Sequence, residues 1–135
     1  MDIVEKCKNV LMKYENILFA YIFGSYAKGN MRADSDVDIG IYLKEEMNIE
    51  EYLKIRMDLT KICKRQVDLV VLNAATPLLK YEIYKNNILL FTRDRTIESN
   101  YKVKTLFEYN DIKRYLDMSY KKTIERLKNE VDFNG

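Results

Sequence analysis

A short run of apolar and aromatic residues, Ile17 to Phe23, limits most strongly what this chain can fold into. The run is too short for a typical helix, and Gly24 stops it, so it predicts a buried strand. A second strand is predicted from Val37 to Leu43, where apolar residues occupy every other position. These two segments place a β-sheet at the centre of the expected fold.

Three helices are predicted around these strands. Residues 2–14 carry apolar side chains at helical spacing, and Asp2 can cap the first turn. Asn48 can cap a second helix that ends near Lys64. Thr76-Pro77 is typical of a third helix start, because threonine caps and proline fits the first helical position.

Two more strands and a long C-terminal helix complete the prediction. The segment Gln66–Leu72 is β-branched and predicts a third strand, and Ile88–Phe91 predicts a short fourth one. Beyond Arg93 we expect a polar stretch and then a helix that packs on the core or on a partner. The apolar stripe of that helix comprises Ile112, Leu116, Tyr120, Ile124, Leu127 and Val131. The expected architecture is an α/β fold with a small mixed sheet, in a single domain 1–135 with a core of about 1–95 and a helical extension of about 96–135.

Composition excludes several classes of function. The 135 residues carry a formal net charge of only +2, so a body that grips duplex DNA through its phosphates is not expected. Histidine is absent, which excludes Ser-His-Asp triads and most zinc sites. No apolar run is long enough to cross a bilayer, and the first residues do not resemble a signal peptide. Cys7 and Cys63 fall on apolar helix faces, so we expect buried thiols and a cytoplasmic protein.

Three aspartates on two of the predicted strands form a candidate catalytic cluster. Asp36 and Asp38 are two residues apart at the start of one strand, so their side chains share a face, opposite the apolar set. Asp68 joins them if the third strand lies alongside. Clustered carboxylates repel one another unless a cation neutralises them, and oxygen ligands without histidine indicate Mg²⁺ or Mn²⁺.

A candidate phosphate site precedes the aspartates. Gly24 directly follows a buried strand and allows close backbone approach, and Ser25 offers a hydroxyl near the start of a short helix. Lys28 and Arg32 lie nearby in sequence and are weaker candidates for contacts with phosphate. Two hard cations held by carboxylates, next to a phosphate site, are what in-line displacement at phosphorus requires.

These residues resemble a known family. The stretch GSYAKGNMRADSDVDI, read as G-S-x10-D-x-D with a later strand aspartate, is similar to the signature of the minimal nucleotidyltransferases of the DNA polymerase β superfamily. Within that superfamily the chain most resembles the MntA-type antitoxins of HEPN/MNT toxin–antitoxin modules. One departure from the pattern is Tyr26, where relatives often carry arginine, and this bears on how the loop grips phosphate.

The resemblance implies roles for the motif residues. Asp36, Asp38 and Asp68 would bind two Mg²⁺ ions, with Asp68 closest to the attacking hydroxyl, and Gly24 and Ser25 would contact the nucleotide triphosphate. The implied reaction transfers AMP from ATP to a tyrosine of a partner HEPN ribonuclease toxin, in a hetero-oligomer.

Other interpretations remain open on the sequence alone. The chain could be a non-catalytic antitoxin that acts by binding, or a nucleotidyltransferase for a small molecule such as an aminoglycoside. A calcium loop starting at Asp34 is disfavoured because Ile39 stands where such a loop needs glycine. The C-terminal tyrosines are candidates for a partner-binding face, and they are Tyr101, Tyr109, Tyr115 and Tyr120.

Overall fold

One four-stranded sheet forms the centre of the protein, with strand order β3-β2-β1-β4. The computed structural model describes residues 2–30, 32 and 35–134, with side chains up to Val131. The central pair β1–β2 and the pair β1–β4 are antiparallel, whereas β2 and β3 are parallel. The mixed sheet predicted from the sequence is therefore confirmed. The strands are β1 (Ile17–Phe23), β2 (Val37–Leu43), β3 (Val67–Val71) and β4 (Asn87–Thr92).

Side-chain caps start three of the helices at the predicted residues. Asp2 accepts a hydrogen bond from the amide of Glu5 at 2.9 Å, and Asn48 accepts one from the amide of Glu51 at 2.8 Å. Thr76 caps in the same way, with Pro77 in the first turn. The helices are α1 (Ile3–Leu11), α2 (Gly24–Ala27), α3 (Ile49–Cys63), the 3-10 turn η1 (Leu72–Ala74), α4 (Pro77–Lys85) and α5 (Arg95–Asn134).

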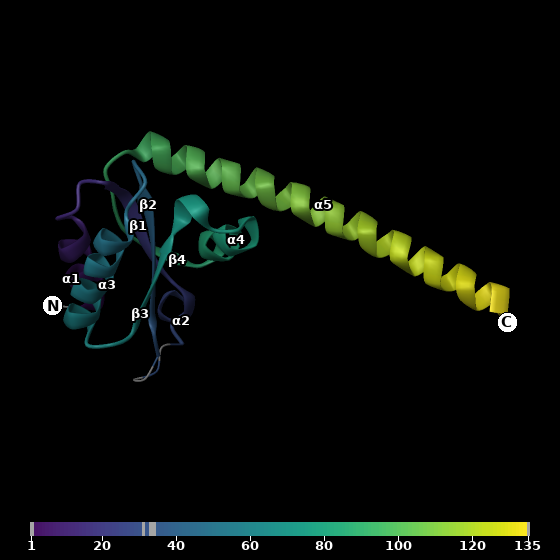
Figure 1. Cartoon of the computed structure of the whole chain (residues 1–135), viewed down its shortest axis with the longest axis horizontal. Coiled ribbons are helices and arrows are strands. Elements are labelled where there is room, and N and C mark those ends of the chain that lie inside the picture. The colour runs from purple at the N-terminus through teal and green to yellow at the C-terminus, as the bar shows by residue number, and fades with distance from the viewer. Residues whose placement is uncertain (1, 31, 33–34, 135) are drawn as a thin grey trace.

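The helices cover the two faces of the sheet unequally (Figure 1). α1 and α3 pack on one face and bury the apolar side chains of alternate strand residues such as Ile22 and Ile39. α4 and the beginning of α5 pack on the other face, over an aromatic cluster around Phe19 and Tyr21. β2 and β3 are parallel neighbours, and the chain passes from one to the other through α3, because parallel strands require a crossover connection.

The prediction of a polar stretch between Arg93 and the last helix is wrong, because α5 begins directly at Arg95. The carboxylate of Asp94 accepts hydrogen bonds from the amides of Thr96 and Ile97, at 3.0 and 3.1 Å, and so caps the N-terminus of α5. Arg93 itself is structural. Its guanidinium donates to the main-chain oxygens of Ile17 and Met12 at 2.8 and 2.7 Å.

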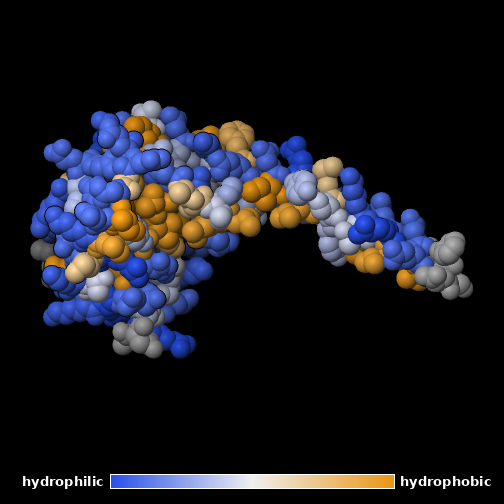
Figure 2. All heavy atoms as spheres, in the orientation of Figure 1, coloured by the Kyte–Doolittle hydropathy of each residue, from blue (hydrophilic) through white to orange (hydrophobic). Residues whose placement is uncertain are grey.

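One face of α5 changes its environment along the helix. In the first half, Glu98 and Thr105 are buried, and Tyr101 packs against Phe19 and Tyr42. The second half continues past the body of the protein (Figure 1), and Tyr120 is 68% exposed there. Of the two placements expected for the apolar stripe, packing on the core is therefore wrong for Tyr120. Figure 2 shows hydrophobic residues along the side of α5 that faces the hollow beside the body.

The predicted burial of both thiols is confirmed. Cys7 and Cys63 are free and buried, and they meet between α1 and α3. None of the helices in the described part of the chain has the length and apolar character needed to cross a membrane.

Candidate active site

A row of four residues crosses the sheet at the end where β2 and β3 begin. Asp38 pairs with Asp68 on one side and with Phe23 on the other, and Phe23 pairs with Asn87. Residues paired across a sheet project from the same face. The third strand thus lies alongside the second, and the register brings Asp38 and Asp68 side by side.

This row opens on the face of the sheet that α4 and α5 partly cover. Asp38 shares a face of β2 with Gly40 and Tyr42, because side chains alternate along a strand. Tyr42 packs with the aromatic cluster beneath α4 and α5. The carboxylates therefore point to the same side of the sheet as these two helices.

Gly24 provides the close approach that the sequence predicts. Its φ of +67° lies in the left-handed region that favours glycine, and a β-carbon there would collide with the Oδ2 atom of Asp38. Ser25 follows in the first turn of α2 and is partly buried. The end of β1 and Gly24 thus lie directly beside the Asp38 carboxylate, and Ser25 is the next residue along the chain.

Burial and neighbouring charges raise the pKa of Asp38 above its ordinary value of 3.8. Removal of the carboxylate from water is the largest cause, followed by the negative charges of Asp68 and then of Asp36. Asp36 and Asp68 are exposed, whereas Asp38 is partly buried. Asp68 and Asp36 are thus close enough to disfavour the ionisation of Asp38, which is the electrostatic condition that a bound cation relieves.

The loop that carries Asp36 is tied to the end of α3. Arg65 donates from Nη1 to the main-chain oxygen of Arg32 at 3.0 Å, and the amide of Arg32 donates to Ser35 Oγ at 2.9 Å. The amide of Val37 donates to the oxygen of Gln66 at 3.0 Å. Sequence reasoning missed Arg65, because it is distant in the chain from Arg32 and no local pattern marks the contact.

Three motif residues, Met31, Ala33 and Asp34, lie outside the described residues. The calcium loop considered from Asp34 begins outside the described residues, and Val37–Leu43 is a strand and not the helix that such a loop would enter. Lys28 and Arg32 are exposed. Tyr26 is partly buried and packs against the hydrophobic core.

The chemical type of the donor atoms at this site suits a hard divalent cation. The candidate ligands are carboxylate oxygens only, which Mg²⁺ prefers. Among the residues with a described structure, no three acidic, cysteine or histidine side chains converge closely enough to hold a metal ion. Asp68 pairs with Asp38 across β2 and β3, and Asp36 lies two residues before Asp38, so the fit rests on donor type and proximity.

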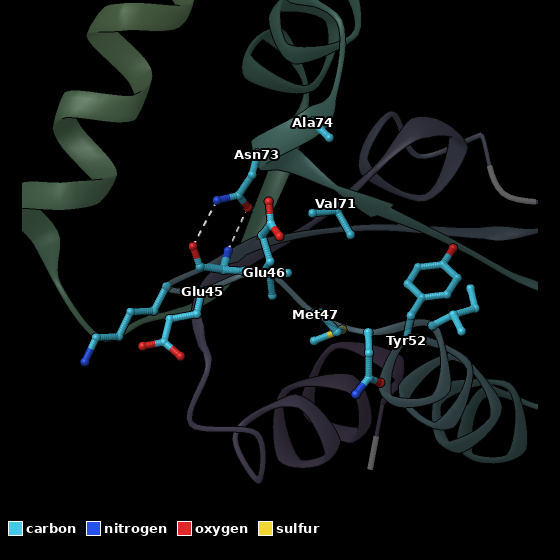
Figure 3. A pocket seen from close by; sticks show the side chains of 11 residues that line it. Glu45, Glu46, Met47, Tyr52, Val71, Asn73 and Ala74 are labelled. Atoms are coloured by element: carbon cyan, nitrogen blue, oxygen red, sulfur yellow. Dashed lines mark hydrogen bonds between the residues drawn. The ribbon is translucent and has the colours of Figure 1, made fainter.

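A cavity of about 720 Å³ lies at the opposite end of β2 and β3 (Figure 3). Asn73 closes one wall through two hydrogen bonds with the main chain of Leu43, at 2.8 and 2.9 Å. Leu43 is the last residue of β2, whereas Asp38 is near its start. Glu45 and Glu46 line this cavity together with Lys44, and the excess of negative charge disfavours a phosphate there.

Comparison with known proteins agrees with this geometry. The family model described as "Polymerase beta, Nucleotidyltransferase" matches residues 5–96, which include the whole candidate site. A curated protein of Methanocaldococcus jannaschii named "Putative protein adenylyltransferase" is 30% identical over 82 residues. The match covers 61% of this chain and 87% of that protein.

Solved structures share the fold over most of the chain. A chain from a crystal structure of a toxin–antitoxin with AMP-PNP superimposes with a TM-score of 0.78 at 20% identity, covering 90% of this chain and 98% of that one. A chain from the complex of tri-AMPylated Shewanella oneidensis HEPN toxin with MNT antitoxin gives a TM-score of 0.69 at 18% identity, with the same coverage. The polymerase-β-like fold predicted from the sequence is confirmed.

Proposed function

Because the chain belongs to the polymerase β nucleotidyltransferase family, we propose that it transfers AMP from ATP to a tyrosine hydroxyl of a protein partner of the HEPN toxin class. The observation that carries the proposal is the register pairing of Asp38 with Asp68 directly beside Gly24. This arrangement puts two carboxylates and a close backbone approach at one point on an open sheet face. The named relative, a protein adenylyltransferase, and the AMPylated toxin in the neighbouring complex support the choice of reaction.

The reaction is an in-line displacement. The tyrosine oxygen attacks the α-phosphorus of ATP and loses its proton, and the bond from that phosphorus to the bridging oxygen of the β-phosphate breaks. Pyrophosphate leaves, and AMP stays joined to the tyrosine through a phosphodiester. In this scheme Asp68 accepts the proton of the attacking hydroxyl, while Gly24 and Ser25 hold the departing phosphates.

Asp36, Asp38 and Asp68 are the residues that would hold two Mg²⁺ ions. When bound, such ions neutralise phosphate charge and lower the pKa of an attacking hydroxyl. Burial is the largest cause of the raised pKa of Asp38, and the negative charges of Asp68 and Asp36 that add to it are what a bound cation would neutralise. Arg65 contributes by fixing the loop that delivers Asp36.

The second half of α5 is the surface that we assign to the partner. Its exposed apolar residues continue the helix face that packs on the sheet in the first half, and they lie on the same side of the sheet as the carboxylates. An apolar helix face of this kind is suited to a helical partner. The exposed residues are Leu116, Tyr120, Leu127 and Val131.

The C-terminal tyrosines divide between two roles in this assignment. Tyr101 belongs to the aromatic cluster, and Tyr109 stacks on Tyr81 with ring centroids 3.5 Å apart. Tyr115 and Tyr120 are 70% and 68% exposed. Only the latter pair is therefore available for a partner, and aromatic side chains frequently anchor interfaces.

The extended α5 surface also favours a second function, neutralisation of the toxin by binding alone. The two functions separate in one experiment, in which Asp38→Asn and Leu116→Glu are compared for toxin binding and for relief of toxicity in cells. Catalytic action predicts that Asp38→Asn still binds but no longer protects, and that Leu116→Glu loses binding. Full protection by Asp38→Asn would support the binding function instead.

A further inference from the structure

Two buried thiols lie in contact between α1 and α3, away from the residues that the transfer reaction uses. The Sγ atoms of Cys7 in α1 and Cys63 at the end of α3 are 3.3 Å apart, although 56 positions separate them in the chain. A disulfide needs about 2.05 Å between sulfurs. A movement of roughly 1.2 Å would therefore join the two helices.

The two cysteines differ in access to solvent. Cys7 is fully buried, whereas Cys63 is 7% exposed. The hydrogen bond with Cys7 lowers the pKa of Cys63, with help from the charges of Lys6 and Arg65 and against the effect of burial. Cys63 is thus placed to react first with a small oxidant, and Cys7 to react second.

The end of α3 is also connected to the active-site loop. Cys63 is the last residue of α3, and two residues later Arg65 holds the main-chain oxygen of Arg32. Asp36 follows in the same loop. A covalent link at Cys63 would fix the helix end from which this hydrogen bond is made.

We propose that Cys7 and Cys63 form a reversible oxidation site, which hydrogen peroxide converts to a disulfide that stiffens the loop before Asp36. The Cys63 thiolate attacks one peroxide oxygen, the O–O bond breaks, and Cys63 becomes a sulfenic acid as hydroxide leaves and takes up the thiol proton as water. The sulfur of Cys7 then attacks Cys63, and a second water leaves. Two thiols are oxidised by two electrons, and one peroxide is reduced to two waters.

The first test is treatment of the folded full chain with hydrogen peroxide, followed by intact mass and thiol titration. The proposal predicts loss of two hydrogen atoms, loss of both free thiols, a melting temperature raised by about 5 °C or more, and full reversal by dithiothreitol. Thiols that stay unreacted until the protein unfolds, or a product linked between molecules, would overturn it.

Single variants assign the order of reaction, and alanine is used because a buried serine hydroxyl could lack a partner. Cys7→Ala should stop at a sulfenic acid on Cys63 that dimedone traps, whereas Cys63→Ala should stay unmodified. Hydrogen exchange then tests the connection to the loop. Slower exchange of the Ser35 and Asp36 amides in the oxidised chain is expected, and an unchanged rate would contradict the connection.

Discussion

The α-carbon of Gly24 lies so close to the carboxylate of Asp38 that a β-carbon at this position would overlap the Oδ2 atom. Two properties of glycine are needed here at once, the positive φ and the missing side chain. The contact fixes the strand end of β1 against the carboxylate that β2 supplies. It is therefore the most direct structural link between the predicted phosphate site and the predicted metal site.

Gly24→Ala should reduce AMP transfer by about 100-fold, because displacement of Asp38 disturbs the geometry of the reacting groups. Gly29→Ala is the matched control. Gly29 also has a positive φ, of +75°, but nothing lies within 4 Å of its added β-carbon. Both variants should lose about 1–2 kcal/mol of unfolding free energy from backbone strain, and only the first should lose activity. Equal transfer rates for the two variants would contradict this account.

Asp38→Asn should make the metal-free protein more stable at pH 7. The folded pKa of Asp38 is raised above the ordinary value, so its ionisation costs free energy in the folded chain. That cost is present in full above the folded pKa and is lost as the pH falls toward 3.8. Thermal melts across this range should show the gain at neutral pH and its disappearance in acid. Asp117→Asn, on the exposed half of α5, should leave the melting temperature unchanged both at neutral pH and in acid.

Tyr21→Phe should destabilise the protein by about 2 kcal/mol, because it leaves a buried carboxylate without its closest donor. The hydroxyl of Tyr21 donates to Glu98 at 2.7 Å, and Glu98 is only 6% exposed. Among the described residues, the Nζ atom of Lys102 is the remaining partner of Glu98, at 3.6 Å. Denaturant unfolding measures the change. Tyr115→Phe is the control, since Tyr115 is 70% exposed, and a similar loss there would argue against the buried hydrogen bond as the cause.

The chain is expected to form one domain, 1–135, and we propose that its folded core extends past the expected end near residue 95 into the first part of α5, to about residue 110. A chain truncated after Asn110 keeps the stacking of Tyr109 on Tyr81, so it should melt within a few degrees of the full chain. Truncation after Thr96 removes Glu98 and Tyr101 and uncovers the aromatic cluster. That shorter chain should fail to unfold cooperatively in calorimetry. A stable fold of residues 1–96 would show that α5 is an independent extension.

Local sequence signals predicted the sheet well. The bounds of β1 and β2 agree with the predicted segments, because an uninterrupted apolar run and a strict alternation are each strong patterns. The third strand is one residue shorter at each end than predicted, and the fourth is one residue longer at each end. Strand ends depend on pairing with neighbours, which a local pattern does not contain. The adjacency of Asp38 and Asp68 followed once β3 was placed next to β2.

The C-terminal half of the chain shows where local signals fail. Asp94 is a helix cap, but Thr96 and the charged residues near it are polar, so the sequence around this cap resembles a polar loop. The apolar stripe of α5 was identified correctly, yet its periodicity is the same whether the face is covered or exposed. Only the three-dimensional arrangement separates buried Thr105 from exposed Tyr120. The contact of Arg65 with Arg32 likewise depends on the folded chain.

The central claim is tested most directly by label transfer from ATP. Purified protein with Mg²⁺ is offered a HEPN-class toxin and ATP labelled at either the α- or the γ-phosphate, with Asp38→Asn as the inactive variant and Gly29→Ala as the active control. The account predicts that label reaches a toxin tyrosine from the α-position only and disappears with Asp38→Asn. Absence of transfer from either position, in a complex that still forms, would contradict it.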